Sequence, residues 1–330
     1  MSAVRKSLYI GVMAAAKRIR PLDLFSKEEW AHVSRRSDLM GLGMVVHCWA
    51  VIGLAMAAAI WQPLLIILAV PIIGARQLGL AVLMHEAAHG GLSQNKRIND
   101  FFGHWLSGAP IGGSLRSYRP YHLQHHKYAQ QPEDPDLVLS APFPITGDSL
   151  KRKIIRDLTG QTFYKQRLNQ FANAMGLKIR EGANTANRMQ AAREAAVPYL
   201  ITNAILLAIL TLLGHWWAFF VLWLLPMATW NMMVTRLRNI AEHAVVPDHN
   251  DPMRHARTTH ASLLERIFIA PYWVNYHCEH HMFMHLPFYR LAEAHALLET
   301  KGVTDRMEVQ HGYWGVLKAA ASKPLTPAPA

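Results

Sequence analysis

The sequence predicts an all-α integral membrane protein with four transmembrane helices in two hairpins and a cytoplasmic helical cap. Three observations predict this fold class. Apolar residues are concentrated in four blocks long enough to cross a bilayer, basic residues lie almost entirely outside these blocks, and histidines cluster after the second and fourth blocks. The 330 residues are 51% hydrophobic and carry a formal net charge of +12.

Two apolar blocks near the N-terminus predict the first hairpin. Residues 40–60 hold no charged side chain, and at 1.5 Å per residue they form about 31 Å of helix, which suffices to cross a bilayer. Residues 64–84 form a second block, interrupted only by Arg76 and Gln77, and three residues separate the two blocks. Because a charge in lipid is unfavourable, we expect Arg76 to act together with Gln77 between helices.

Two further blocks predict the second hairpin. They cover residues 197–213 and 216–235, and only Gly214 and His215 separate them. Residues 101–121 are also apolar, but glycines and prolines interrupt them. This segment is too irregular for a fifth span, so we expect an interfacial or re-entrant piece or a simple connector.

The basic residues predict the orientation of a single domain covering residues 1–330. Of the 34 Lys and Arg residues, all but Arg76 lie in three polar segments, which flank the hairpins at 40–84 and 197–235. Cationic segments stay in the cytoplasm, so we place 1–39, 85–195 and 236–330 there. Within these segments we expect an interfacial helix near the N-terminus and a disordered tail, "KPLTPAPA". The excess of positive charge beside spans favours lipid headgroups over nucleic acid as the partner.

Histidines recur at helical spacing in three clusters. "HEAAH" contains two histidines at i, i+4, whereas "HLQHH" and "HCEHH" each contain three at i, i+3, i+4, so each cluster lies on one face of a helix. A fourth element, "NIAEH", follows the last span. The residues of these four elements are His85, His89, His122, His125, His126, Asn239, His243, His277, His280 and His281.

The topology brings all nine histidines to one membrane face, because the second and fourth spans both end there. Nine imidazoles are too many for one metal ion, and they suit a di-metal site in the cap. Imidazole binds Zn, Cu, Fe and Ni alike, so the ligand type does not identify the metal. Alone, "HEAAH" is also the pattern of a zinc protease with Glu86 as its base. As an intramembrane zinc metalloprotease, the chain would leave seven clustered histidines without a role.

The three clusters, their order between two hairpins and the Asn-x-x-x-His element resemble the integral-membrane fatty acid desaturase family. The resemblance extends from about Arg76 to about Leu298 and includes "HHKYAQQPEDPDL" and "NYHCEHHMFMHLPFYRL". It implies two iron ions as the cofactor, ligated by the nine histidines, with Asn239 reaching one iron through water. It also implies O2-dependent desaturation of a lipid-linked or thioester-linked fatty acyl chain. A di-iron hydroxylase or ketolase of a lipid or carotenoid would have similar clusters.

Acidic residues near the histidines are candidates for orienting the imidazole rings. Ligating imidazoles usually donate their second N–H to a carboxylate or a carbonyl group. We favour Glu86, Glu242 and Asp136 for this role, ahead of Asp134 and Glu279. We expect no catalytic residue beyond the metal ligands.

The partners and the location follow from the same features. The sequence contains no recognisable haem or flavin module, so we expect a separate electron donor, either a ferredoxin or a small cytochrome with its reductase. The other partner is a membrane lipid or acyl substrate. We expect the bacterial inner membrane, with both termini and the active site cytoplasmic.

Overall fold

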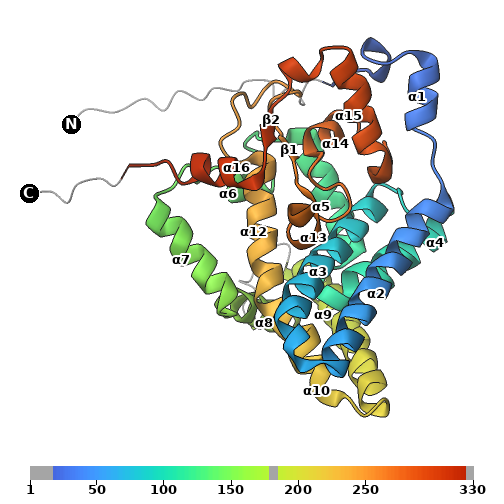
Figure 1. The fold of residues 1–330 in the computed structure, drawn as a ribbon, viewed down its shortest axis with the longest axis vertical. Helices are drawn as coiled ribbons and strands as arrows, with labels where there is room; N and C mark the ends of the chain where they lie inside the picture. Colours follow the sequence, from blue (N-terminus) through green and yellow to red (C-terminus); the bar gives the residue numbers. More distant parts are fainter. Residues whose placement is uncertain (1–17, 178–184, 325–330) are drawn as a thin grey trace, which may run out of the picture.

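The structure is a computed structural model, and it describes residues 18–177 and 185–324. The described part is mostly helical, with one small sheet (Figure 1). The interfacial helix expected near the N-terminus and the end of the expected disordered tail fall in residues 1–17 and 325–330, outside the described residues.

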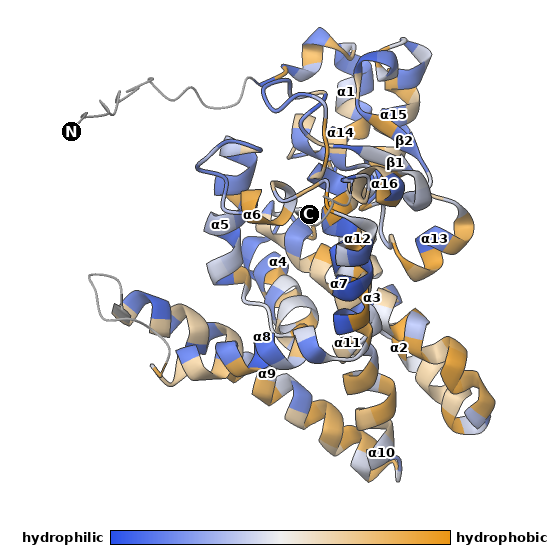
Figure 2. Ribbon diagram, turned by 90° about the vertical axis from the view of Figure 1, so that its left-hand side faces the viewer, coloured by the Kyte–Doolittle hydropathy of each residue, from blue (hydrophilic) through white to orange (hydrophobic). Residues whose placement is uncertain are grey.

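The described residues include four helical stretches that are long and apolar enough to cross a membrane, as the sequence predicts. They are Lys27–Trp61, Pro63–Ala88, Ala186–Leu212 and Trp216–His243. Their main helices are α2 (Asp38–Trp61), α3 (Ile66–Ala88), α9 (Thr185–Leu212) and α12 (Trp230–His243). Figure 2 shows the apolar residues at one end of the molecule and the polar residues at the other.

The fourth stretch is an irregular helix. It comprises α10 (Trp216–Ala218), the π-helix η5 (Phe219–Leu224) and α11 (Leu225–Ala228) before α12 begins. Irregular backbone among apolar helices needs hydrogen-bond partners from its neighbours. Gln77 of α3 supplies one, because its Nε2 donates to the Trp223 carbonyl over 2.8 Å, and the Trp223 indole donates to Asn203 of α9 over 2.7 Å.

The interrupted segment after α3 forms short elements that are attached to the long helices. It comprises α4 (Lys96–Gly103), the π-helix η3 (His104–Gly108) and the 3-10 helix η4 (Ala109–Ile111). The Trp49 indole of α2 donates to the Leu106 carbonyl over 2.7 Å. The Asn203 amide of α9 donates to the Pro110 carbonyl over 3.0 Å. These bonds hold the segment between α2 and α9.

The remaining elements include those of the polar end and several short connecting helices. The helices are α1 (Lys27–Val33), α5 (Leu115–Tyr128), α6 (Leu137–Ser140), α7 (Gly147–Leu158), α8 (Gln161–Ala174), α13 (Leu263–Phe268), α14 (His277–Met282), α15 (Leu291–Thr300) and α16 (Tyr313–Ala320). Single-turn 3-10 helices occur at η1 (Pro21–Asp23), η2 (Pro63–Leu65), η6 (Phe288–Arg290) and η7 (Thr304–Arg306). Strands β1 (Thr258–His260) and β2 (Val309–His311) pair in parallel.

Helix α3 is the centre of the packing. It contacts α2, α4, α5 and α12, and nearly every residue from Ile73 to Ala88 is buried. A helix that is apolar on all sides favours burial in this way. Its buried end carries His85 and His89 into the polar end of the molecule.

The close contact of α2 with the turn after α3 predicts different effects for two glycines of α2. A Cβ atom on Gly41 would lie 2.2 Å from the Leu92 carbonyl oxygen, whereas a Cβ on Gly43 would meet nothing within 4 Å. We expect Gly41→Ala to reduce the free energy of unfolding by about 1–3 kcal/mol because backbone must move. We expect Gly43→Ala to leave it unchanged or higher, because alanine favours helix. Thermal unfolding of the detergent-purified variants measures both, and equal melting temperatures would contradict the described contact.

Candidate metal centre

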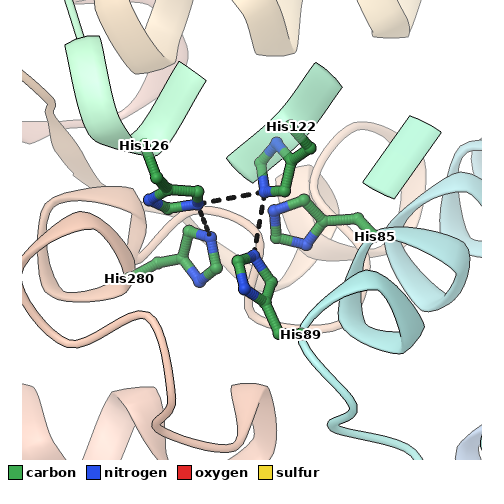
Figure 3. A group of neighbouring side chains, drawn as sticks. All are labelled: His85, His89, His122, His126 and His280. Carbon is green, nitrogen blue, oxygen red and sulfur yellow. Dashed lines mark hydrogen bonds between the residues drawn. The ribbon is translucent and has the colours of Figure 1, made fainter. Parts of the chain in front are cut away.

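Five histidines surround one point (Figure 3). We call these residues group one: His85, His89, His122, His126 and His280. They come from three places: the end of α3, helix α5 and helix α14. Their ring nitrogens face one another: His122 Nε2 lies 2.9 Å from His89 Nε2, and His126 Nε2 lies 3.0 Å from His122 Nε2 and 2.9 Å from His280 Nε2. The fifth member, His85, has a buried Nε2 with no hydrogen-bond partner.

Four further histidines form group two next to group one. They come from α5, the last residue of α12 and α14. His125 Nε2 lies 3.2 Å from both His243 Nε2 and His281 Nε2, and His277 Nε2 lies 3.0 Å from His243 Nε2. Within each group the possible ligand atoms all lie within 4.8 Å of one another.

Two of the sequence clusters are divided between the two groups. On α5, His122 and His126 face group one while His125 faces group two. On α14, His280 faces group one and its two neighbours in the cluster face group two. The i, i+3, i+4 spacing predicts only that three rings share a helix face, and that face is wide enough to line two points. Each three-histidine cluster is therefore a bridge between two sites.

An arginine binds the carbonyl groups at the C-terminal end of two helices that carry site histidines, α3 and α12. Arg119 of α5 donates to the carbonyls of Ala87 and Ala88 at the end of α3, over 2.9 and 3.1 Å. Arg257 donates to the Ala241 and Ala244 carbonyls at the end of α12, over 3.1 and 2.9 Å. The last carbonyls of a helix lack partners within the helix and carry partial negative charge, so a guanidinium there fixes the helix end.

Two site imidazoles, those of His125 and His243, donate their Nδ1–H group to an oxygen that can only accept. His125 Nδ1 donates to Asp134 Oδ1 over 2.8 Å, and His243 Nδ1 donates to the His255 carbonyl over 3.0 Å. Carboxylate and carbonyl oxygens hold the proton on Nδ1, which leaves a lone pair on Nε2 in the centre of the group.

The acidic residues chosen from sequence lie at different distances from these rings. Glu86 Oε1 is 3.2 Å from His85 Nδ1, and Glu242 Oε1 is 3.4 Å from His277 Nδ1. Asp134 lies closer to a site ring than Asp136, which the sequence favoured. Asp136 Oδ2 lies 3.9 Å from His125 and Asp136 Oδ1 accepts from the Tyr121 hydroxyl, whereas the buried Asp134 bonds the ring directly.

Within the described residues, no hydrogen bond joins Glu279 or Asn239 to a site ring. Glu279, although it lies inside the third cluster, turns away and binds His295 and Thr258. Asn239 lines a small cavity next to group two, together with His243 and His277.

Sequence reasoning missed two neighbours of the groups. His255 belongs to none of the histidine clusters of the sequence, yet it is buried and its ring lies 5.5 Å from that of His281. Tyr118 stacks on His122 with ring centroids 5.1 Å apart and planes inclined by 10°. Tyr118 lies four residues before His122, and this spacing could have identified it.

Burial keeps six of these imidazoles neutral, those of His89, His122, His126, His277, His280 and His281. It lowers the pKa of His89 to about 3, and burial together with the neighbouring imidazoles lowers the pKa of His122, His126, His277, His280 and His281 well below the ordinary value. Neutral imidazole is the form that binds a metal ion. Two groups of converging imidazoles therefore fit two metal ions, and their donor type suits Fe, Zn, Cu or Ni.

Comparison with known proteins agrees with this geometry. The family model described as fatty acid desaturase matches residues 59–311, which include both histidine groups. The chain belongs to the fatty acid desaturase family. The family identifies it as an oxidoreductase and, with the four apolar helices, as an integral membrane protein.

This desaturase-family chain is also similar to three characterised enzymes. It is 22% identical to an sn-1 oleoyl-lipid 12-desaturase of Picosynechococcus sp. (strain ATCC 27264 / PCC 7002 / PR-6), over 85% of this chain and 80% of that one. It is 26% identical to a dihydrorhizobitoxine desaturase of Bradyrhizobium elkanii, over 82% and 79%. It is 24% identical to a beta-carotene ketolase of Paracoccus sp. (strain PC1), over 77% and 91%.

The contact between Asp134 and His125 predicts which carboxylate supports metal binding. We expect Asp134→Asn to weaken metal retention by about 10–100-fold, because an amide can donate to Nδ1 and no longer fixes the proton there. Asp136→Asn, which removes an acid 3.9 Å from the same ring, should retain the metal. Metal content per chain after dialysis against a chelator measures both variants. Equal losses in the two variants would contradict the assignment.

Proposed function

We propose that the protein catalyses O2-dependent desaturation of a fatty acyl chain, lipid-linked or thioester-linked, at two iron ions. The observation that carries the proposal is the gathering of nine histidines from four sequence elements into two adjacent groups, in a chain of the fatty acid desaturase family. The similarity to an oleoyl-lipid desaturase supports an acyl chain as the substrate.

The two groups would each hold one iron. Group one offers five imidazoles and group two offers four, and the cavity beside group two gives Asn239 a place to act through a water molecule. Glu86, Glu242 and Asp134 would orient the rings. Asp136, which accepts from the Tyr121 hydroxyl, would support the His125 ring from 3.9 Å.

The substrate's chemistry explains why metal ions are needed. A methylene C–H bond has no acidic proton, so an acid–base pair alone offers no route to its cleavage. Two irons bound here would supply the oxidation, using O2 and two delivered electrons. Overall, O2 takes up the two hydrogens of the acyl chain together with two delivered electrons and two protons, which gives a double bond and two waters.

The protein's own contribution is to orient the imidazole rings and to exclude water from them. The rings are held by buried acceptors, and the surrounding burial keeps bulk water from both groups. Dry surroundings protect a reactive site from side reactions. The apolar ends of α2, α3, α9 and α12 would bring the acyl chain to the groups from the lipid phase.

The membrane arrangement follows from charge. In our proposal the four apolar helices cross the membrane as two hairpins of one domain. The polar end lies in the cytoplasm, since all Lys and Arg residues but Arg76 lie outside the apolar blocks of the sequence. We propose the bacterial inner membrane as the location. A separate ferredoxin or small cytochrome would deliver the electrons.

Two alternatives differ in what they predict. A hydroxylase or ketolase acting on a lipid or carotenoid could use the same groups, and the ketolase among the relatives supports this second candidate. A zinc protease built on His85 and His89 is disfavoured, because both rings belong to a five-histidine group.

Lipid profiling of a bacterial host tests the proposal. The host expresses the wild type, His281→Ala or the control His249→Ala, whose side chain is exposed and outside both groups, together with a matched electron donor. We expect a lipid lacking two hydrogens in the wild type and control, and its loss in His281→Ala. Mass-spectrometric fragmentation then locates the double bond. A product that gains one oxygen would support the hydroxylase instead, and no change in lipids with the donor present would contradict the proposal for acyl lipids.

A further inference from the structure

A cationic groove lies between α2, α3 and α13, apart from both histidine groups. Its polar lining consists of His47, Arg76, Arg266 and Tyr272, and no acidic residue of the described chain lines it. Arg76 lies nine residues before His85 on α3, about 13 Å along the helix. The groove is therefore separate from the metal centre.

Arg76 is the central charge of the groove, and its partners are neutral. The side chain is 8% exposed, and its Nη2 donates to the carbonyls of Arg266 and Ile267 over 3.2 and 2.9 Å. Its guanidinium lies 5.4 Å from the centre of the Tyr272 ring, and its Nε is buried without a hydrogen-bond partner. Gln77, which the sequence led us to expect beside Arg76 in a contact between helices, donates to the Trp223 carbonyl. The positive charge of Arg76 thus has no counter-ion among the residues that the structure describes.

Arg266 adds a second charge that nothing in the groove neutralises. Arg266 is exposed, and the acid next to it in sequence, Glu265, is engaged by the backbone N–H groups of Ser262 and Tyr313. Two guanidinium groups without a carboxylate form a site for a negatively charged group.

The surroundings of the groove place it at the membrane boundary. Leu263 and Leu264 at the start of α13 are 72% and 66% exposed, and Val46 on the adjacent face of α2 is 63% exposed. Figure 2 shows α13 beside α3, where the apolar end of the molecule meets the polar end. Exposed leucines beside basic residues are typical of a helix that lies in the membrane interface.

We propose that this groove binds an anionic phospholipid. The phosphate would lie between Arg76 and Arg266, with the Tyr272 hydroxyl and His47, which are bonded to each other over 3.0 Å, at its edge. The acyl chains would lie along Met44, Val51 and Ile72. Such a lipid ties α2 and α3 to the segment that leads from α13 to His277, and so it stabilises the position of the third histidine cluster.

Binding of defined lipids to the purified full-length, metal-loaded protein tests the proposal. Native mass spectrometry in detergent compares phosphatidylglycerol with phosphatidylcholine of the same acyl chains, because choline would cancel the phosphate charge. We expect phosphatidylglycerol to bind more tightly, and Arg266→Gln, at an exposed position, to weaken it about tenfold through loss of a charged hydrogen bond. Arg97→Gln, on the exposed face of α4 away from the groove, is the matched control and should bind as the wild type does.

A second variant separates lipid binding from a purely structural role of Arg76. Arg76→Lys keeps the charge but loses the planar fork. We expect phosphatidylglycerol to raise the melting temperature of the wild type more than that of this variant. Equal binding of the two lipids, equal effects of the Arg266 and Arg97 variants, or the same rise in melting temperature in the wild type and Arg76→Lys would each overturn the proposal.

Discussion

The structure depends on one constraint: nine imidazoles, most of them buried, must be held in two groups, with the ligand atoms of each group within 4.8 Å of one another. Nitrogen lone pairs facing one another repel, so this arrangement requires a rigid frame, and it fits a cation in each group. The frame is helix α3, buried along its second half, with α5, α12 and α14 converging on its end. Arg119 and Arg257 complete it by capping the two helix ends from which histidines project.

The irregular parts of the fold depend on hydrogen bonds from neighbouring helices. The π-helix η5 presents the Trp223 carbonyl to Gln77 of α3. The segment around η3 and η4 is held by Trp49 and Asn203 in a similar way. Polar side chains within apolar helices therefore serve as anchors for backbone that departs from the α-helix.

Much of the fold and all nine site histidines could be predicted from sequence, because both follow from local patterns. Apolar length marks the long helices, and the spacing of histidines marks the helix faces. The division of "HLQHH" between two groups could not be predicted, because it depends on where α12 and α14 approach α5. That Asp134 and not Asp136 bonds the His125 ring directly could not be predicted for a related reason. Both follow His125 closely in sequence, and only the turn after α5 decides which carboxylate reaches the ring.

His255 shows that the spacing of histidines in the sequence does not identify every residue near the site. It belongs to no helical cluster, and tertiary packing alone places it against His281. Function has a similar division between local and tertiary information. In the proposed function, the histidine groups would account for oxidation of an unreactive C–H bond, whereas the choice of carbon and product would depend on how the apolar helices position the substrate.

The measurement that tests the central claim most directly is the metal content of the purified protein, determined by elemental analysis together with Mössbauer spectroscopy of iron-57-enriched samples. The two histidine groups predict about two irons per chain, both in imidazole-rich surroundings. One zinc per chain, with no iron bound after expression in iron-sufficient medium, would contradict the account.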